Sequence, residues 1–239
     1  MAEAAIPVPT WTEIASVGGD CLLVVPIGSF EQHGPHLPLD TDTRVATAIV
    51  DAVSELPFVI VAPPLAYGAS GEHAGFVGTL SIGSEVLADV LVELVRSARG
   101  SCAGVVFVCA HGGNADGIRL AKERCRSEGD TVFVWGARVD GGDAHAGRTE
   151  TSLMLAIAPD EVRRDELEVG RTEPLDELWP ELRRGGVKAV SANGILGDPT
   201  LATAAEGHLL FGALVDELSG SLELWWSDLA DQVGAGAPQ

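Results

Sequence analysis

Five of the six histidines in this sequence lie shortly after apolar runs, and aspartate or glutamate residues accompany them. Imidazole and carboxylate groups are the usual protein ligands of Zn²⁺, Mn²⁺ and Fe²⁺. The four cysteines form no CxxC pair, and none is placed to join the histidines. The pattern therefore predicts a site that binds divalent metal ions through histidine, aspartate and glutamate side chains.

The spacing of the best candidates indicates how such a site is built. Glu31 and His33 are two residues apart, so both side chains point to the same side of an extended segment. His111 lies in a glycine-flanked turn, and Asp42 and Glu150 each lie at the start of a predicted helix. Two histidines and three carboxylates are enough for two divalent cations that share a bridging carboxylate and leave positions open for water. Such mixed sites accept Fe²⁺, Zn²⁺ or Mn²⁺, and we expect Fe²⁺ or Zn²⁺.

Each of these residue types also has an ordinary structural interpretation. Asp42 or Glu150, taken alone, is typical of a helix cap, and Asp40 of a capping or solvated residue. His36, followed by Leu-Pro, favours a structural role, and His208 inside the last predicted helix favours a packed or surface position. The joint occurrence of acidic and imidazole groups behind several apolar runs is what favours a site.

The apolar runs and the segments between them predict an α/β fold. Continuous runs rich in Val, Ile, Leu and Phe are typical of parallel strands covered on both faces. They occupy residues 22–27, 58–62, 104–109 and 131–139, and helical patterns occupy 43–56, 85–99 (with Ser84 as a cap), 116–127, 149–158 and about 203–231. This alternation predicts a three-layer α/β/α sandwich with a mostly parallel sheet. In such sheets the site forms at the carboxyl ends of the strands, where the histidines lie.

The chain organisation favours one domain over residues 1–239, because no linker-like segment divides it. Residues 160–199 are rich in proline and glycine and predict an irregular excursion that covers the site or contacts a neighbouring subunit. Residues 232–239 predict a frayed tail.

Composition excludes several classes of partner. Fifteen Lys and Arg against 35 Asp and Glu give a net charge of −20, so a basic surface for nucleic acid or anionic lipid is not expected. No apolar stretch reaches the roughly 20 residues that cross a bilayer, and the start of the chain lacks the pattern of a signal peptide. Four cysteines without disulfide-like spacing are typical of a reducing compartment. We therefore expect a cytoplasmic protein.

Four motifs in this order resemble the creatininase family of metal-dependent amidohydrolases. They are Gly28-Ser-Phe-Glu-Gln-His-Gly-Pro-His-Leu-Pro-Leu-Asp-Thr-Asp42, Gly78-Thr-Leu-Ser81, His111-Gly-Gly-Asn114 and His145-Ala-Gly-Arg-Thr-Glu-Thr-Ser152. The resemblance implies a creatininase-like α/β fold with a parallel sheet. It also implies a homo-oligomer, which we expect to be a hexamer or octamer.

The same resemblance implies a set of metal ligands. Glu31, Asp42 and His111 would hold one ion, and His33, Asp42 and Glu150 the second, with Asp42 bridging. Creatininase itself has a glutamate ligand two residues after the histidine that matches His111. This chain has Gly113 there, which argues against a creatinine-specific site and leaves Glu150 to supply the carboxylate.

Two further motifs, Gly68-Ala-Ser-Gly-Glu-His73 and Ser191-Ala-Asn-Gly-Ile-Leu-Gly-Asp-Pro-Thr200, resemble those family members that act on a modified precursor peptide. The resemblance implies cleavage near the C-terminus of that peptide, with release of a fragment that carries a crosslinked Val-Tyr unit.

Catalysis of amide cleavage requires a proton for the leaving nitrogen. His145 is our candidate for the general acid, with Glu72 and His73 as second choices. The candidates for substrate contacts are Ser70, Asn114 and Arg148.

Two alternatives remain open. One is a small-molecule amidohydrolase with a creatinine-, formamide- or lactam-like substrate, which a small closed pocket would favour over an open groove. The other is a metal-binding peptide carrier without catalysis. A serine or cysteine hydrolase is disfavoured, because the sequence has no GxSxG motif and Cys109 lies inside an apolar run.

Overall fold

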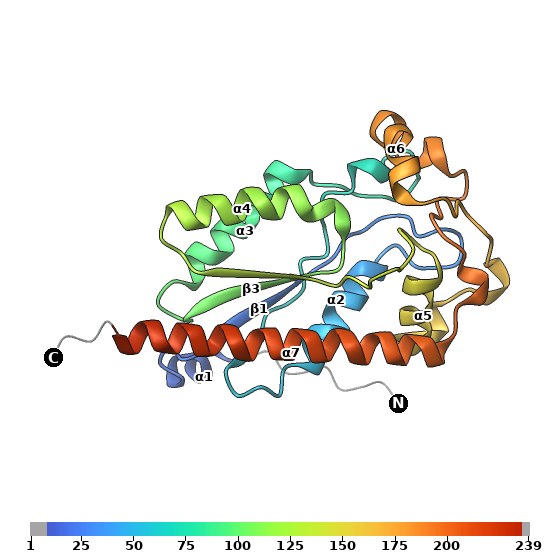
Figure 1. The fold of residues 1–239 in the computed structure, drawn as a ribbon. Coiled ribbons are helices and arrows are strands. Elements are labelled where there is room, and N and C mark those ends of the chain that lie inside the picture. Colours follow the sequence, from blue (N-terminus) through green and yellow to red (C-terminus); the bar gives the residue numbers. More distant parts are fainter. Residues whose placement is uncertain (1–8, 236–239) are drawn as a thin grey trace.

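A parallel sheet lies at the centre of the computed structural model, which describes residues 9–235, with side chains described through Leu229. Its strands are β1 (Leu22–Ile27), β2 (Val59–Val61), β3 (Gly104–Cys109) and β4 (Val132–Gly136), in the order β2-β1-β3-β4 (Figure 1). This confirms the predicted parallel sheet. Only the two outer strands are shorter than predicted.

The register of the central strands explains why they read as continuous apolar runs. β1 and β3 pair from Leu22 opposite Gly104 to Ile27 opposite Cys109. Successive side chains point to opposite faces: Leu22 and Val24 join one apolar cluster, and Val25 and Ile27 join the other. Because both faces are buried, both sets of positions must be apolar.

Helices cover the two faces of the sheet (Figure 1). On one face lie α3 (Ser84–Ala98) and α4 (Ala115–Ser127), which pack on the odd-numbered residues of β1. On the other lie α2 (Thr41–Ala52), α5 (Arg148–Ile157) and the long α7 (Ala204–Ala235). The predicted three-layer α/β/α arrangement is confirmed. None of the helices in the described part of the chain is both long and apolar enough to cross a membrane.

Several elements differ from the predictions. A short helix, α1 (Trp11–Ser16), was not predicted and begins at a capping box of Thr10 and Glu13. Ser84 is the first residue of α3 rather than its cap, which is Gly83. α7 continues through residues 232–235, and residues 236–239 lie outside the described range.

The segment 160–199 was predicted to be irregular but contains a helix, α6 (Leu175–Val190). The helix is kinked at Gly186 (φ 69°), and Leu178, Val187 and Val190 on it bury against Leu196. The free energy gained by this packing outweighs the loss of helix stability caused by Pro180, Gly185 and Gly186. The remaining elements are 3₁₀ turns: η1 (Gly71–His73), η2 (Gly112–Asn114), η3 (Pro159–Glu161), η4 (Arg164–Glu166) and η5 (Pro199–Leu201).

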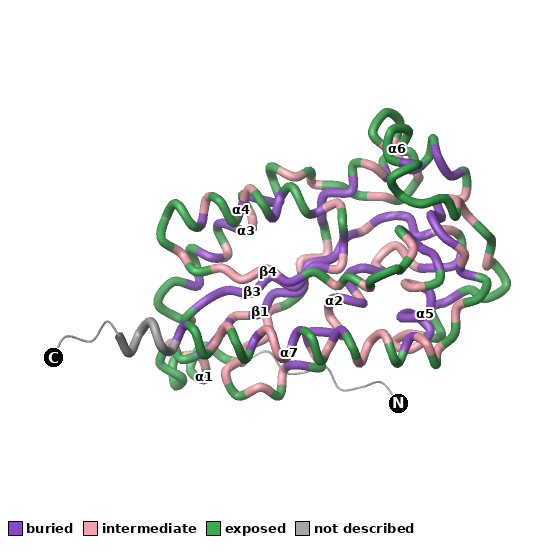
Figure 2. Tube along the Cα trace, viewed as in Figure 1, coloured by how far each residue is buried: buried purple, intermediate pink, exposed green. Residues whose placement is uncertain are grey.

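The strand order places a crevice for a site between β1 and β3. The chain leaves β1 toward β2 on one side and then crosses to β3 on the other, so the loops after β1 and β3 diverge. Figure 2 shows that the trace stays buried beyond the end of β1, where a surface loop would be exposed. Polar residues in this loop are thus held inside the protein.

Candidate metal centre

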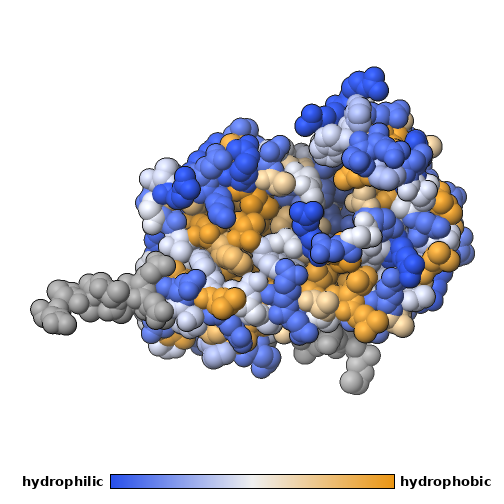
Figure 3. All heavy atoms as spheres, in the orientation of Figure 1, coloured by the Kyte–Doolittle hydropathy of each residue, from blue (hydrophilic) through white to orange (hydrophobic). Residues whose placement is uncertain are grey.

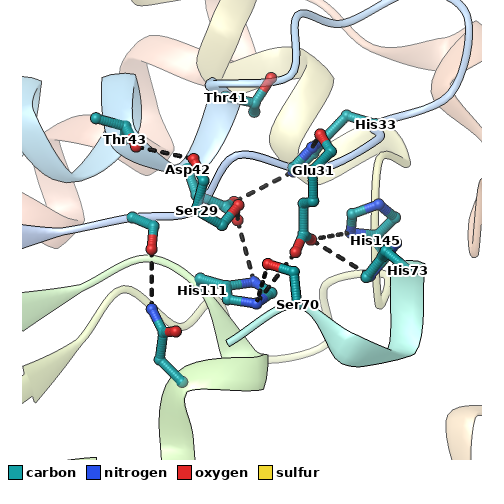
Figure 4. Close-up of polar contacts among 12 residues, drawn as sticks. Ser29, Glu31, His33, Thr41, Asp42, Thr43, Ser70, His73, His111 and His145 are labelled. Carbon is teal, nitrogen blue, oxygen red and sulfur yellow. Dashed lines mark hydrogen bonds and ion pairs between the residues drawn. The ribbon is translucent and has the colours of Figure 1, made fainter. Parts of the chain in front are cut away.

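Side chains from three elements converge at the carboxyl edge of the sheet (Figure 4). Glu31 follows β1, Asp42 lies in the first turn of α2, and His111 follows β3. His111 Nε2 lies 3.1 Å from Glu31 Oε2, and His111 Nδ1 lies 3.1 Å from Asp42 Oδ2. One donor atom from each residue lies within 4.8 Å of the other two. These three buried residues form a first candidate ligand group.

Close packing between the end of β1 and the start of α2 fixes Asp42. Thr43 Oγ1 donates to the carbonyl oxygen of Ser29 (3.0 Å), and Ser29 Oγ donates to Asp42 Oδ2 (2.7 Å). A Cβ at Gly28 would lie 2.4 Å from Thr43 Cα. The glycine is therefore required for this approach.

A second group surrounds His33. Its Nε2 lies 3.2 Å from Asp42 Oδ1 and 3.9 Å from Glu150 Oε2, so Asp42 faces both groups, one with each oxygen. His33 Nδ1 lies 3.0 Å from the carbonyl oxygen of Glu31. Because a carbonyl only accepts, Nδ1 carries a hydrogen, and Nε2 faces the two carboxylates, where it holds a proton in the metal-free protein and would offer a lone pair to a metal ion. Metal-ligating histidines commonly have this arrangement.

A strained turn brings His145 to the same centre as Glu150. Ala146 has φ 51°, in the left-handed region that non-glycine residues rarely adopt. Its backbone N–H donates to Glu150 Oε2 (2.6 Å). His145 Nδ1 lies 3.8 Å from Glu31 Oε1, and His73 Nε2 lies 3.3 Å from that same oxygen. One nitrogen or oxygen from each of His33, His145 and Glu150 lies within 4.8 Å of the other two, as in the first group.

The Glu31 carboxylate is the clearest sign that the residues fit a cation. It is fully buried, and neither oxygen has a hydrogen-bond partner among the described residues. A buried carboxylate that accepts no hydrogen bond is costly, and burial, partly offset by the nearby His111 and His33, raises the pKa of Glu31 to about 7. A positive ion between Glu31, Asp42 and His111 would remove this cost.

The neighbouring groups show the same need for positive charge. Loss of hydration raises the pKa of Glu150 to about 7. Burial opposes the charged form of His33 and His111, but Asp42 outweighs it and raises the pKa of His33 to about 10 and of His111 to about 9. Protons thus bind where a metal ion would bind.

Gln32 was missed by the sequence analysis and organises two histidines. Its Oε1 accepts from Gly34 N–H and its Nε2 donates to Gly194 O (3.0 Å), which fixes the orientation of the amide. The second amide hydrogen points at His73 Nδ1 (2.8 Å). His145 Nε2 lies 2.8 Å from the Gln32 carbonyl oxygen and must donate to it. We therefore assign His145 the tautomer with an unprotonated Nδ1 that faces the centre.

His145 is held in its neutral form. Burial, together with the nearby His33 and His73, keeps the pKa of His145 well below its usual range. Replacing Gln32 with leucine removes the side-chain amide that contacts His73 and His145, but it keeps the backbone carbonyl that accepts from His145 Nε2. We expect kcat to fall roughly 10- to 100-fold through loss of the amide contacts, while the metal content stays the same. Steady-state kinetics and metal analysis of the variant would check this, and unchanged kcat would show that the Gln32 amide does not position these histidines.

The space beside Gly113 is occupied by Glu72. A Cβ at position 113 would lie 2.1 Å from Glu72 Oε1 and 2.5 Å from both the Ala69 carbonyl oxygen and His111 Nε2. Glu72 Oε1 itself lies 3.8 Å from His111 Nε2. A ligand at position 113 therefore has no room in this chain, and a carboxylate approaches His111 from η1 instead.

Gly113→Ala should consequently disturb the centre. The added methyl group must displace Glu72, His111 and the backbone of Ala69, and overpacking of this kind costs about 1–3 kcal/mol of stability. We expect a lower unfolding temperature and at least a roughly tenfold loss of kcat/KM. Gly112→Ala is the matched control, because nothing lies within 4 Å of a Cβ there. Equal unfolding temperatures and equal kcat/KM for the two variants would contradict this explanation of Gly113.

Two of the predicted substrate contacts have other positions. Asn114 is fully buried, accepts from Ala69 N–H (2.8 Å) and donates to Gly28 O (2.9 Å), so it ties three loops together. Arg148 forms an ion pair with Glu206 (2.8 Å) beside a second cavity, which shares Gly142, Asp143 and Thr149 with the cavity at the candidate ligands. Asn114 and Arg148 lie outside the ligand groups, and their contacts with substrate stay predictions. Ser70 is buried with its hydroxyl 3.5 Å from His111 Nε2, beside the ligands.

Residues interpreted as structural lie outside the ligand groups. His36 is fully buried, and its Nε2 lies 2.9 Å from Thr151 Oγ1. Asp40 pairs with Arg44 at 2.8 Å. His208 is exposed on α7.

Comparison with known proteins agrees with this geometry. Residues 9–222 match the family model Creatininase, described as creatinine amidohydrolase. The chain is 51% identical over 213 residues to the mycofactocin precursor peptide peptidase of Mycolicibacterium smegmatis (strain ATCC 700084 / mc(2)155), which covers 87% of this chain and 86% of the relative. It is 29% identical over 247 residues to the creatinine amidohydrolase of Pseudomonas putida, which covers 89% and 94%.

Solved creatininase structures superpose on the whole fold. A mutant creatininase described as Zn-Zn type has a TM-score of 0.75 and 27% identity, and covers 91% of this chain and 96% of that one. A creatininase described as the Mn form has a TM-score of 0.74, with the same identity and coverage. This chain therefore belongs to the creatininase family.

Proposed function

We propose that this protein is a metal-dependent peptidase that hydrolyses an amide bond of the mycofactocin precursor peptide. The observation that carries the metal dependence is the buried Glu31 carboxylate, which lacks a hydrogen-bond partner among the described residues and faces His111 and Asp42. The substrate is taken from the name of relatives such as the M. smegmatis protein at 51% identity.

The ligands of the proposed centre follow from the two groups around Asp42. Glu31, Asp42 and His111 would hold one ion. His33, Asp42 and Glu150 would hold the other, since His33 Nε2 lies 3.2 Å from Asp42 Oδ1 and 3.9 Å from Glu150 Oε2. When bound, Fe²⁺, Zn²⁺ or Mn²⁺ supplies Lewis acidity, which polarises a carbonyl and lowers the pKa of water. The carboxylates and imidazoles of this chain suit all three ions.

His145 is the proposed proton carrier. Its neutral Nδ1 faces the centre and accepts a proton from the attacking water, while its Nε2–H stays bonded to the Gln32 carbonyl oxygen. The imidazolium then donates that proton to the leaving amide nitrogen, which departs poorly without it. Glu72, at the edge of the centre, is the second candidate for this transfer.

The shape of the cavity favours a peptide over a small ring. The cavity is about 780 Å³ and extends from Asp42, His111 and Glu150 along α4 and the segment after β4 to Leu175 of α6. It reaches exposed residues, so an extended chain has room to enter. A creatinine-like amide is the second candidate, favoured by the family description, but Gly113 lacks the ligand of creatininase.

The direct test is cleavage by purified protein that has been stripped of metal and reloaded. We expect mass spectrometry to detect a released peptide fragment with reloaded protein and none with stripped protein. Turnover of creatinine without peptide cleavage would favour the small-molecule alternative. Stoichiometric peptide binding without cleavage would favour a carrier.

Metal binding should weaken as the pH falls. Glu31 and Glu150, with a pKa of about 7 in the metal-free protein, must lose protons to bind a cation, as must His33 and His111. Protons therefore compete with the metal, and the apparent affinity should rise roughly tenfold or more per unit between about pH 6 and 8. Competition against a chelator at several pH values measures this. A pH-independent affinity would contradict it.

We also propose that the chain forms a homo-oligomer, a hexamer or octamer. Large apolar side chains are exposed on α7, including Leu209 and Leu224. Light scattering after size-exclusion chromatography would determine the number of subunits, and a monomeric mass would contradict the proposal.

A further inference from the structure

Three cations line the cavity that reaches the candidate ligands Asp42, His111 and Glu150. Arg119 and Lys122 lie on α4 and Arg138 follows β4, and we refer to these three residues as the cation wall. The protein carries a net charge of −20 with only 15 Lys and Arg. A group of positive charges in the reaction cavity of such an acidic chain attracts anionic parts of a substrate there and little elsewhere.

The cation wall is available to a ligand. In the part of the chain that the structure describes, neither Lys122 nor Arg138 forms an ion pair or a hydrogen bond through its side chain. Arg119 shares its charge with the exposed Asp116 (3.6 Å) and Glu123 (3.0 Å), which are weak competitors at a solvated surface.

The nearby acidic groups of the cavity are already engaged. The Asp143 carboxylate accepts from the backbone N–H groups of Arg148 and Thr149. Asp42 and Glu150 belong to the proposed metal centre. An incoming anion therefore meets little uncompensated negative charge beside the cation wall.

The position of the wall relative to the centre suits the end of a peptide. α4 begins at Ala115, shortly after His111, and Lys122 lies seven residues further along, which is about 10 Å at 1.5 Å per residue. One extended peptide residue spans about 3.3–3.6 Å. An anion held by the wall would thus lie about three residues from a carbonyl at the centre.

Apolar side chains line the same cavity as the cation wall and the three ligands. They include Ile118, Val134, Val139 and Leu175. Figure 3 shows apolar side chains gathered on this face between α4 and α7, with hydrophilic side chains around them. This lining suits the apolar side chains of a short fragment whose charge lies at its end.

We propose that the cation wall binds the C-terminal carboxylate of the peptide substrate and thereby selects a bond close to the C-terminus. This inference rests on the proposed peptidase function. An acidic side chain near the end of the peptide presents the same carboxylate chemistry, so the test must separate the two sources.

The test compares three forms of the modified precursor peptide with the metal-loaded protein. They are the free acid, the C-terminal carboxamide, and a free acid whose acidic side chains are replaced by amides. Charge-assisted hydrogen bonds favour the free acid, and we expect the carboxamide to lower kcat/KM roughly 10- to 100-fold, mainly through KM. Replacing the acidic side chains should have little effect.

Protein variants complete the test. The double variant Lys122→Gln with Arg138→Gln should lose the preference for the free acid. It should cleave the free acid and the carboxamide with the same low kcat/KM that the unchanged protein shows for the carboxamide. Arg126→Gln, which removes an exposed charge of α4 outside the cavity, should keep the preference. Metal content and unfolding temperature verify that the variants are intact. Binding of the released fragment, as acid and as amide, gives a second readout that does not require turnover.

The outcomes distinguish failure of the proposed carboxylate site from failure of the proposed peptidase function. Equal cleavage of acid and carboxamide, or a preference that survives in the double variant, would overturn the proposed carboxylate site and leave the peptidase function standing. A preference that follows the acidic side chains would also overturn it. Failure of the unchanged, metal-loaded protein to cleave any form would contradict the peptidase function itself.

Discussion

Asp42→Asn should remove both metal ions and nearly all activity. Asp42 Oδ1 faces His33 at 3.2 Å and Asp42 Oδ2 faces His111 at 3.1 Å, so one carboxylate serves both ligand groups. An amide offers a single neutral oxygen and cannot bridge two cations. We expect kcat/KM to fall by at least roughly a thousandfold, because metal activation of water and carbonyl is lost together.

Asp40→Asn is the matched control for this variant. Asp40 lies two residues earlier, is half-buried and pairs with Arg44 rather than with the centre. It should keep near-normal activity and metal content, measured by elemental analysis beside the kinetics. An Asp42→Asn protein that retains two ions and full turnover would show that the ligand groups are wrongly assigned.

His145→Ala should lower kcat roughly 10²- to 10⁴-fold, the usual contribution of a positioned proton carrier. A ring nitrogen of His145 also lies within 4.8 Å of potential ligand atoms of His33 and Glu150, so metal content must be measured in the same variant. Loss of kcat with unchanged metal content supports the proton-carrier role. Loss of both would make His145 a ligand.

His208→Ala provides the matched control for His145→Ala. His208 is exposed on α7 and belongs to none of the ligand groups found among the described residues. Its replacement should leave kcat unchanged. Normal kcat in His145→Ala itself would contradict both roles of that histidine.

The ends of β1 and β3 were predictable because both strands are buried on both faces and lie in the middle of the sheet. β2 and β4 are edge strands with partly exposed side chains, and their pairing stops earlier than the apolar runs do. α6 was not predicted because its stability comes from packing against Leu196 rather than from helix propensity.

The approach of Glu31, Asp42 and His111 was predictable because parallel strands bring their carboxyl ends to one edge. The roles of Gln32 and Gly113 were not. Gln32 acts through contacts with His73, 41 residues away, and with His145, 113 residues away. The need for a glycine at position 113 becomes clear only from Glu72, whose carboxylate occupies the space that a side chain at 113 would need. Such long-range relations leave no local pattern in the chain.

Titration of the metal-free protein with Zn²⁺, Fe²⁺ or Mn²⁺, followed by metal analysis and peptide cleavage on the same samples, tests the central claim most directly. The account predicts that activity rises with bound metal and saturates at two ions per chain. Full cleavage by protein from which all divalent metal has been removed would contradict it.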